Sequence, residues 1–222
     1  MEKQAKPLEK FLTEFFLSVI RPQSYRNIFY LLFSFPLGII YFTFAITGLS
    51  VGVGLIPAFL IGIPILMFVL LTSKRIMSFE RGLVSVYLKL ELPEYFPAST
   101  PCDRLITRIK NEVTDPVSWK SIIFLLMKLP IGIFNFTVVV TFYSLSLGFL
   151  AAPIVNLVAG HEAAIKVFDN DLFVLLSINM SPEAKSAVYA VIGFLLVFVS
   201  VYISNLLAYL NGKIVGLMYE KW

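Results

Sequence analysis

The sequence contains little charge, and the places where charge is missing are informative. Charged residues make up 14% of the 222 residues, hydrophobic residues make up 58%, and mean hydropathy is +0.85. From Asn27 to Ser73 the chain has no Asp, Glu, Lys, Arg or His. One membrane-spanning helix needs roughly 20 apolar residues. The composition excludes an ordinary soluble globular domain and predicts an integral membrane protein, with two spans in this uncharged run.

Residues that carry most enzyme chemistry are also scarce. Cys102 is the only cysteine, which excludes an intramolecular disulfide and a thiolate metal cluster. His161 is the only histidine; Glu162 follows it, but no second histidine stands four residues further on to complete a zinc-binding pattern. A single loop histidine gives no catalytic triad. We therefore expect no enzyme activity, no catalytic residue, no metal site and no cofactor.

The chain contains one segment twice. Residues 24–54 and 118–148 align without a gap at a constant offset of 94, and twelve of the thirty-one positions are identical. The identities include residues other than apolar ones, such as Pro36 with Pro130 and Gly38 with Gly132. Two unrelated apolar helices would not share these residues, so the pattern predicts a duplicated membrane unit.

The predicted fold is an all-α integral membrane protein of one domain, residues 1–222. It has four transmembrane helices from two parallel two-helix repeats, at about 22–92 and 115–215, plus cytoplasmic or interfacial amphipathic helices. The spans are expected near 30–49, 56–72, 128–152 and 188–210, with a glycine-rich turn after the first. The amphipathic helices are expected at about 6–20, after 76 and at 103–113.

Charge predicts the orientation of the spans. Lys and Arg gather before the first span and between the second and third, whereas only Lys166 and Lys185 lie in the loop at about 153–187. The positive-inside rule then makes both termini cytoplasmic and this loop external, in the plasma membrane. We expect no cleavable signal peptide. The basic balance favours anionic membrane lipids as partners and not nucleic acid.

Several motifs resemble the putative sensor family. They are Asp115-Pro116, Trp119-Lys120, Pro130-x-Gly132, Leu145-Ser-Leu-Gly148 and Ala152-Pro153, with Tyr25-Arg26, Phe35-Pro36-Leu-Gly38 and Glu80-Arg81 in the first half. This family is a four-span membrane domain found before some bacterial histidine kinases and alone in some prokaryotic proteins. The resemblance covers about residues 22–212 and implies a signal-input module. We expect it here without the kinase, and so with its output passing to a separate histidine kinase or regulator.

Polar residues in the spans give the candidate binding sites. Hydroxyl residues recur at matching positions of the two copies and form a polar stripe on each, for which helix packing is favoured over a ligand-lined crevice. The crevice, if formed, would use Thr47, Ser50, Thr141, Tyr143 and Ser144. Lys128 stands within the third span, where snorkelling to the headgroups is favoured over an intramembrane functional role. Signal output is assigned to Glu80, Arg81, Arg104 and Arg108.

Three functions remain open at this stage. The first is a membrane-embedded sensor that passes a signal to a separate partner, and we expect it to be a homo-oligomer. The second is a small transporter or pore subunit, which the lack of paired intramembrane charges disfavours. The third is a structural or lipid-binding subunit of a larger membrane complex.

Overall fold

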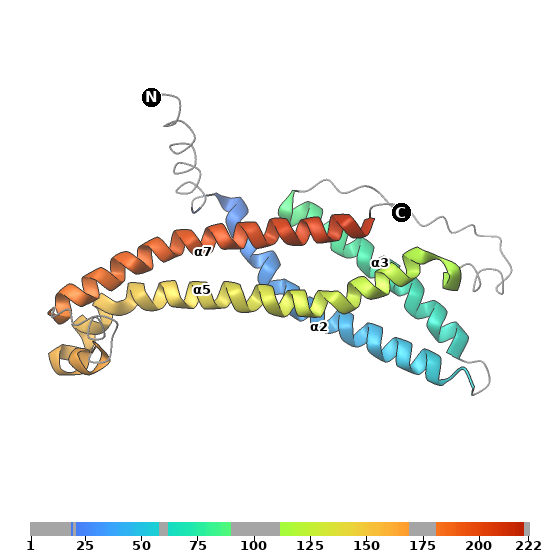
Figure 1. The fold of residues 1–222 in the computed structure, drawn as a ribbon, viewed down its shortest axis with the longest axis horizontal. Helices are drawn as coiled ribbons and strands as arrows, with labels where there is room; N and C mark the ends of the chain where they lie inside the picture. The colour runs from blue at the N-terminus through green and yellow to red at the C-terminus, as the bar shows by residue number, and fades with distance from the viewer. Residues whose placement is uncertain (1–18, 20, 58–61, 90–111, 169–180, 220–222) are drawn as a thin grey trace, which may run out of the picture. The chain divides into compact units, whose positions relative to one another are not determined.

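The computed structural model describes residues 19, 21–57, 62–89, 112–168 and 181–219, and this part of the chain is helical without a strand. Its long helices are α2 (Pro22–Gly54), α3 (Gly62–Leu88), α5 (Pro116–Phe168) and α7 (Pro182–Tyr219) (Figure 1). The amphipathic helices expected at about 6–20 and 103–113 lie outside the described residues except for residues 19, 112 and 113. So does most of the linker between α3 and α5.

Local sequence explains where the helices begin and end. Helices α2, α5 and α7 each begin at a proline, whose fixed φ suits the first helical position and whose missing N–H would have no partner there. At the start of α5, Asp115 Oδ1 accepts a hydrogen bond from the Val117 amide at 3.0 Å, which caps the helix. Helix α3 ends at Leu88, and Lys89 follows it in the left-handed region with φ of 54°.

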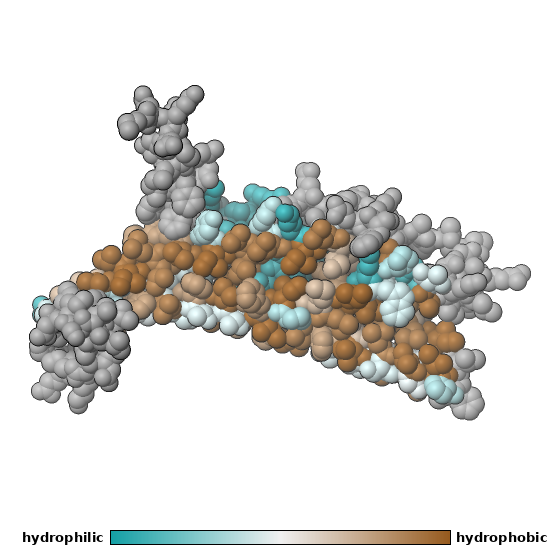
Figure 2. Space-filling model, in the orientation of Figure 1, coloured by the Kyte–Doolittle hydropathy of each residue, from teal (hydrophilic) through white to brown (hydrophobic). Residues whose placement is uncertain are grey.

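All four helices are long and apolar enough to cross a membrane. Many of their large hydrophobic side chains are exposed, among them Phe33, Phe68, Phe134 and Leu147. Figure 2 shows this hydrophobic surface over α5 and α7. Apolar surface of this extent needs lipid or protein to cover it. The prediction of an all-α, four-span membrane protein is confirmed.

The helices differ in their limits from the predicted spans. Helix α3 begins at Gly62 rather than near 56, and it continues without a break to Leu88. Helix α5 passes Pro153 and ends at Phe168, so the segment between α5 and α7 is shorter than the loop expected at 153–187. Pro153 does not end α5, because a proline in an apolar helix can be accommodated by local adjustment of the backbone.

The chain forms two compact units. Unit 1 contains residues 1–24 and 138–204, and unit 2 contains residues 25–137 and 205–222. Unit 2 therefore holds nearly all of α2, all of α3, the first part of α5 and the last part of α7. It includes nearly all of the first duplicated segment and residues 118–137 of the second.

The two copies cross each other in unit 2 at their shared glycines. A Cβ atom added to Gly38 of α2 would lie 2.9 Å from the Lys128 carbonyl oxygen and 3.0 Å from Leu129 Cα. A Cβ atom added to Gly132 of α5 would lie 2.7 Å from the Ser34 carbonyl oxygen and 3.0 Å from Phe35 Cα. Ser34 and Lys128 are equivalent positions of the repeat, as are Phe35 and Leu129. The contact is therefore reciprocal, as across a local twofold axis, and only glycine permits it.

The second helices of the copies are also equivalent. A single constant shift in numbering aligns Gly62 of α3 with Gly193 of α7, Ser73 with Ser204, and Val84 with Val215, and all of these are buried. A Cβ atom added to Gly62 would meet the Ile56 amide nitrogen at 2.6 Å, and one added to Gly193 would meet the Leu150 amide nitrogen at 2.7 Å. Ile56 and Leu150 are equivalent positions of the repeat. The same shift aligns Glu80 of α3 with Asn211 of α7.

The direction of the copies in unit 2 differs from the prediction. Gly48 faces Val69 and Gly52 faces Leu66, so α2 and α3 form an antiparallel pair. Helix α3 and the start of α5 run in the same direction. Lys74 contacts Asp115, and Glu80, further along α3, contacts Lys128, further along α5. Figure 1 accordingly shows α2 and α5 running in opposite directions. The copies were predicted to be parallel from flanking charges, which indicate a membrane side and carry no information about which helices pack together.

Candidate functional site: a buried charge cluster

An ion pair between the two copies lies in the core of unit 2. Lys128 Nζ of α5 contacts Glu80 Oε1 of α3, and the two side chains are 2% and 0% exposed. Both residues lie inside candidate membrane spans. Charged groups are expensive in such a place unless they are paired, and paired ones commonly mark a functional site.

Two tyrosines of α2 complete the pair. Tyr30 Oη accepts a hydrogen bond from Lys128 Nζ at 3.2 Å and donates one to Glu80 Oε1 at 2.9 Å. Tyr41 Oη donates to the other oxygen, Glu80 Oε2, at 3.4 Å. We refer to Tyr30, Tyr41, Glu80 and Lys128 as the charge cluster. Both carboxylate oxygens of Glu80 and the ammonium of Lys128 have partners, which is the condition for tolerating charge in a low-dielectric interior.

Helix geometry places these four residues together. Tyr30 and Tyr41 are eleven residues apart, about three helical turns, and therefore lie on the same face of α2. That face of α2 contacts α3, which carries Glu80. Lys128 lies beside Gly38, at the crossing of α5 and α2. Tyr30, Tyr41 and Glu80 come from the first copy and Lys128 from the second. The charge cluster therefore joins α2, α3 and α5 across the duplication.

The structure corrects the interpretation of Lys128. Snorkelling to the headgroups was favoured, but the side chain is buried and turned toward Glu80. Charges paired across α3 and α5 also contradict the statement that the spans lack paired intramembrane charges. The sequence contained one usable signal, since the position that holds Lys128 in the second copy holds Ser34 in the first. A cation that appears in only one copy needs a specific partner, and Glu80 is the acidic residue in α3.

A second group of charges lies at the start of α5. Lys74 Nζ of α3 contacts Glu112 Oε2 and Asp115 Oδ2, each at 2.6 Å. The Ser118 hydroxyl also donates to Glu112 Oε2, at 3.3 Å. Lys74 therefore fixes the beginning of α5 to α3, and Asp115 both caps the helix and contacts this lysine.

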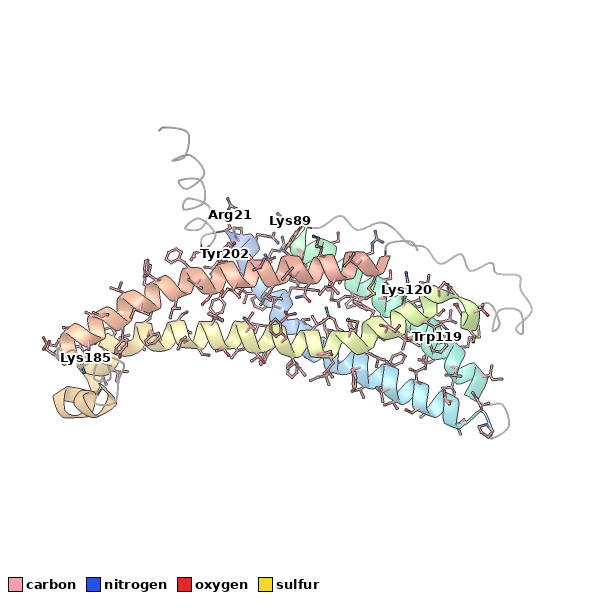
Figure 3. The ribbon with its side chains drawn as sticks, in the orientation of Figure 1. Arg21, Lys89, Trp119, Lys120, Lys185 and Tyr202 are labelled. Atoms are coloured by element: carbon pink, nitrogen blue, oxygen red, sulfur yellow. The ribbon has the colours of Figure 1, made fainter. Side chains whose placement is uncertain are left out.

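Aromatic residues mark the beginnings of the duplicated segments. Trp119 is exposed on the first turns of α5, beside Lys120 (Figure 3), and its Nε1 donates to the Val113 carbonyl oxygen at 2.8 Å. Tyr25, its equivalent in α2, is also exposed. Exposed Tyr and Trp at the ends of spans are typical of the membrane interface.

The residues of the expected crevice belong to different units: Thr47 and Ser50 lie in unit 2, and Thr141, Tyr143 and Ser144 lie in unit 1. Thr47, Ser50, Thr141 and Ser144 are exposed, so these four side chains are not packed inside their own units, whereas Tyr143 is half-buried with a buried hydroxyl oxygen. A different set of hydroxyls makes the helix contact in unit 1, where the Ser146 and Ser200 hydroxyls lie 3.0 Å apart. Of the residues assigned to output, Glu80 lies in the charge cluster and Arg81 beside it is half-buried. Arg104 and Arg108 lie outside the described residues.

Four apolar helices and a buried charge cluster define a multi-pass helical membrane protein. The chain belongs to the family described as "Putative sensor", whose model matches residues 30–218. No curated protein and no solved structure matches the chain. The resemblance noted in the sequence is therefore confirmed, and the charge cluster lies inside the matched region.

Proposed function

We propose that this protein is a membrane-embedded sensor that passes a signal to a separate protein. The family supports a sensor role. The mechanism rests on the Glu80–Lys128 ion pair. Among the residues that the structure describes, this pair joins a buried charge of one copy to a buried charge of the other. A stimulus that separates α3 from α5 must break this pair or move it as a unit.

The charge cluster favours two discrete arrangements of α3 and α5 over a continuous range of positions. Separating two buried charges in an apolar interior costs several kcal/mol unless each finds a new partner, so intermediate positions are unfavourable. Two discrete arrangements are what a switch requires. In this proposal the stimulus favours one arrangement of α3, and Arg81 and the segment after α3 carry the change to the partner.

The proposed setting follows from the charge distribution. In this proposal the sensor lies in the plasma membrane of a prokaryotic cell, with its basic N-terminal side facing the cytoplasm. Anionic lipids contact the basic residues at this side. The partner is a histidine kinase or regulator encoded as a separate chain, and the sensor forms a homo-oligomer through its exposed apolar and hydroxyl-bearing faces.

The test compares chromosomal variants in the source cell. Transcript responses to defined changes in pH, osmolarity and membrane fluidity are recorded for the wild type, a deletion strain and Lys128→Met. We expect the deletion to remove one of these responses and Lys128→Met to remove the same one. Lys213→Met, a substitution of an exposed lysine of α7, is the matched control. A deletion strain that keeps every response would overturn the proposal.

A transporter is the second candidate, because the charge cluster provides the paired intramembrane charges whose expected absence disfavoured it. Chains of carboxylate, amine and hydroxyl groups carry protons in many pumps and transporters. In purified protein reconstituted into liposomes, proton flux that Glu80→Gln abolishes and Lys213→Met preserves would favour this candidate. Absence of proton flux in the wild type would count against this candidate.

A further inference from the structure

The local twofold of unit 2 creates a second position equivalent to the charge cluster. The position of Lys128 is held there by Ser34, and the positions of Tyr30 and Tyr41 by Phe124 and Asn135. The shift that aligns α3 with α7 puts Asn211 in place of Glu80. We call Ser34, Phe124, Asn135 and Asn211 the neutral counterpart. All four residues are buried and belong to unit 2.

The neutral counterpart keeps polar character, and two of its polar atoms have no hydrogen-bond partner. Ser34 Oγ and Asn135 Nδ2 are buried and make no hydrogen bond, although the two residues are 0% and 1% exposed. Asn211 Nδ2 donates to the Leu207 carbonyl oxygen at 2.9 Å, which leaves its own oxygen as an acceptor. Leaving a buried donor unsatisfied costs roughly 1–3 kcal/mol. These two unpartnered atoms, at positions equivalent to Lys128 and Tyr41 of the charge cluster, are the observation on which the inference rests.

The neutral counterpart is also built from smaller side chains. In each equivalent pair its residue has fewer heavy atoms: Ser for Lys, Phe for Tyr, Asn for Tyr, and Asn for Glu. Helices α2 and α5 cannot move closer together to fill the volume of these missing atoms. At their crossing, Gly38 and Gly132 each already lie against the backbone of the other helix. Because protein interiors are close-packed, the volume of the missing atoms has to be filled by a bound molecule, by water or by closer packing of α7.

We propose that the neutral counterpart binds a neutral, membrane-soluble molecule through a carbonyl oxygen. The unpartnered Asn135 amide and Ser34 hydroxyl are donors and so call for an oxygen acceptor. None of the four side chains is charged, and an ion without a counter-charge would be strongly disfavoured there. Ser34 lies twelve residues after the start of α2, about 18 Å along the helix, so the ligand reaches it from the apolar interior.

Two sources supply this chemistry, namely a quinone ring and a diacylglycerol. This ligand site rests on the proposed function and deepens it, because the bound molecule would be the stimulus of the sensor. Binding is nevertheless measured on purified protein without any partner. Its failure would therefore leave the proposed function untouched, and the loss of a cellular response would leave the binding result untouched.

The experiment measures thermal unfolding of the protein in nanodiscs with added decylubiquinone or dioctanoylglycerol. Native mass spectrometry of protein extracted from its own membranes accompanies it. We expect one probe to raise the unfolding midpoint of the wild type, and we expect Asn135→Leu and Ser34→Ala each to abolish that shift. Thr43→Val, which removes an exposed hydroxyl from the same helix as Ser34, is the matched control and should keep the shift.

The two probes distinguish a quinone from a diacylglycerol, and the mass measurement shows whether any ligand is bound. A shift with decylubiquinone alone identifies a quinone-type ligand, and a shift with dioctanoylglycerol alone identifies a diacylglycerol-type ligand. A retained mass that Ser34→Ala loses supports a ligand that neither probe reproduces. If neither probe shifts the midpoint and no mass is retained, water alone fills the neutral counterpart and the inference is wrong. Ser34→Ala removes a single oxygen, so a failure of Asn135→Leu to fold would not prevent the test.

Discussion

Gly38 of α2 and Gly132 of α5 each lie against the backbone of the helix that carries the other. This reciprocal contact brings Lys128 to Glu80 and Tyr30. A methyl group at either glycine would come within 3.0 Å of backbone atoms that cannot rotate away. The crossing therefore sets the distance between the two copies.

Substituting either glycine is expected to separate the helices. Gly38→Ala and Gly132→Ala should each lower the free energy of unfolding by about 1–3 kcal/mol, as overpacking does in cores. Gly148→Ala is the control on the same helix as Gly132, because an added Cβ atom there meets nothing within 4 Å. This substitution should be neutral or stabilising by up to about 1 kcal/mol. Equal effects at Gly132 and Gly148, measured by chemical unfolding in detergent micelles, would contradict the crossing.

Removing one member of the ion pair should cost more than removing both. Lys128→Met leaves Glu80 buried without its counter-charge and is expected to destabilise the protein by about 3–5 kcal/mol. Adding Glu80→Gln to this variant should recover part of the loss, because no buried charge then remains. A double-mutant cycle based on unfolding midpoints measures the coupling. Additive effects of the two substitutions would show that the side chains do not interact.

Asp115 has two roles that substitution can separate. Asp115→Asn keeps an oxygen that can cap α5 and loses the charge facing Lys74, whereas Asp115→Ala loses both. We expect the alanine variant to be less stable than the asparagine variant by about 0.5–2 kcal/mol, the usual value of a helix cap. Thermal unfolding followed by circular dichroism provides the comparison. Identical midpoints would mean that the cap contributes nothing.

Lys89 offers a substitution that should stabilise the chain. Its φ of 54° places a Cβ-bearing residue in the left-handed region directly after α3. Lys89→Gly removes that strain, and we expect a gain of about 0.5–1 kcal/mol after allowing for the greater freedom of glycine in the unfolded chain. Lys89→Val should instead destabilise the protein, because branching at Cβ makes this conformation worse. The order Gly, Lys, Val in unfolding midpoint is the expected result.

The sequence predicts the helices well because apolar length decides them. The uncharged run from Asn27 to Ser73 requires two spans, and the duplication locates a third. Helix limits are less predictable: Pro153 resembles a helix end, yet α5 continues past it. A proline signals a break only when the freed backbone groups have no other way to be satisfied.

The charge cluster could not be predicted because its members are far apart in the chain and come from different copies. Glu80 follows an apolar segment and reads as a residue of a cytoplasmic extension, and Lys128 alone reads as a snorkelling cation. Only the crossing at Gly38 and Gly132 shows that the two meet. The crevice expected along the hydroxyl stripes stays a prediction, because Thr47 and Ser50 lie in one unit and Thr141 and Ser144 lie in the other.

The charge cluster also bears on how such a chain could have arisen from one ancestral hairpin. Tyr30 and Glu80 lie in the first half and Lys128 in the second, so neither half paired with itself would contain both a cation and its anion at this position. The fused halves have become complementary, and neither can replace the other. Expressed as separate polypeptides, they should assemble with each other and not with themselves.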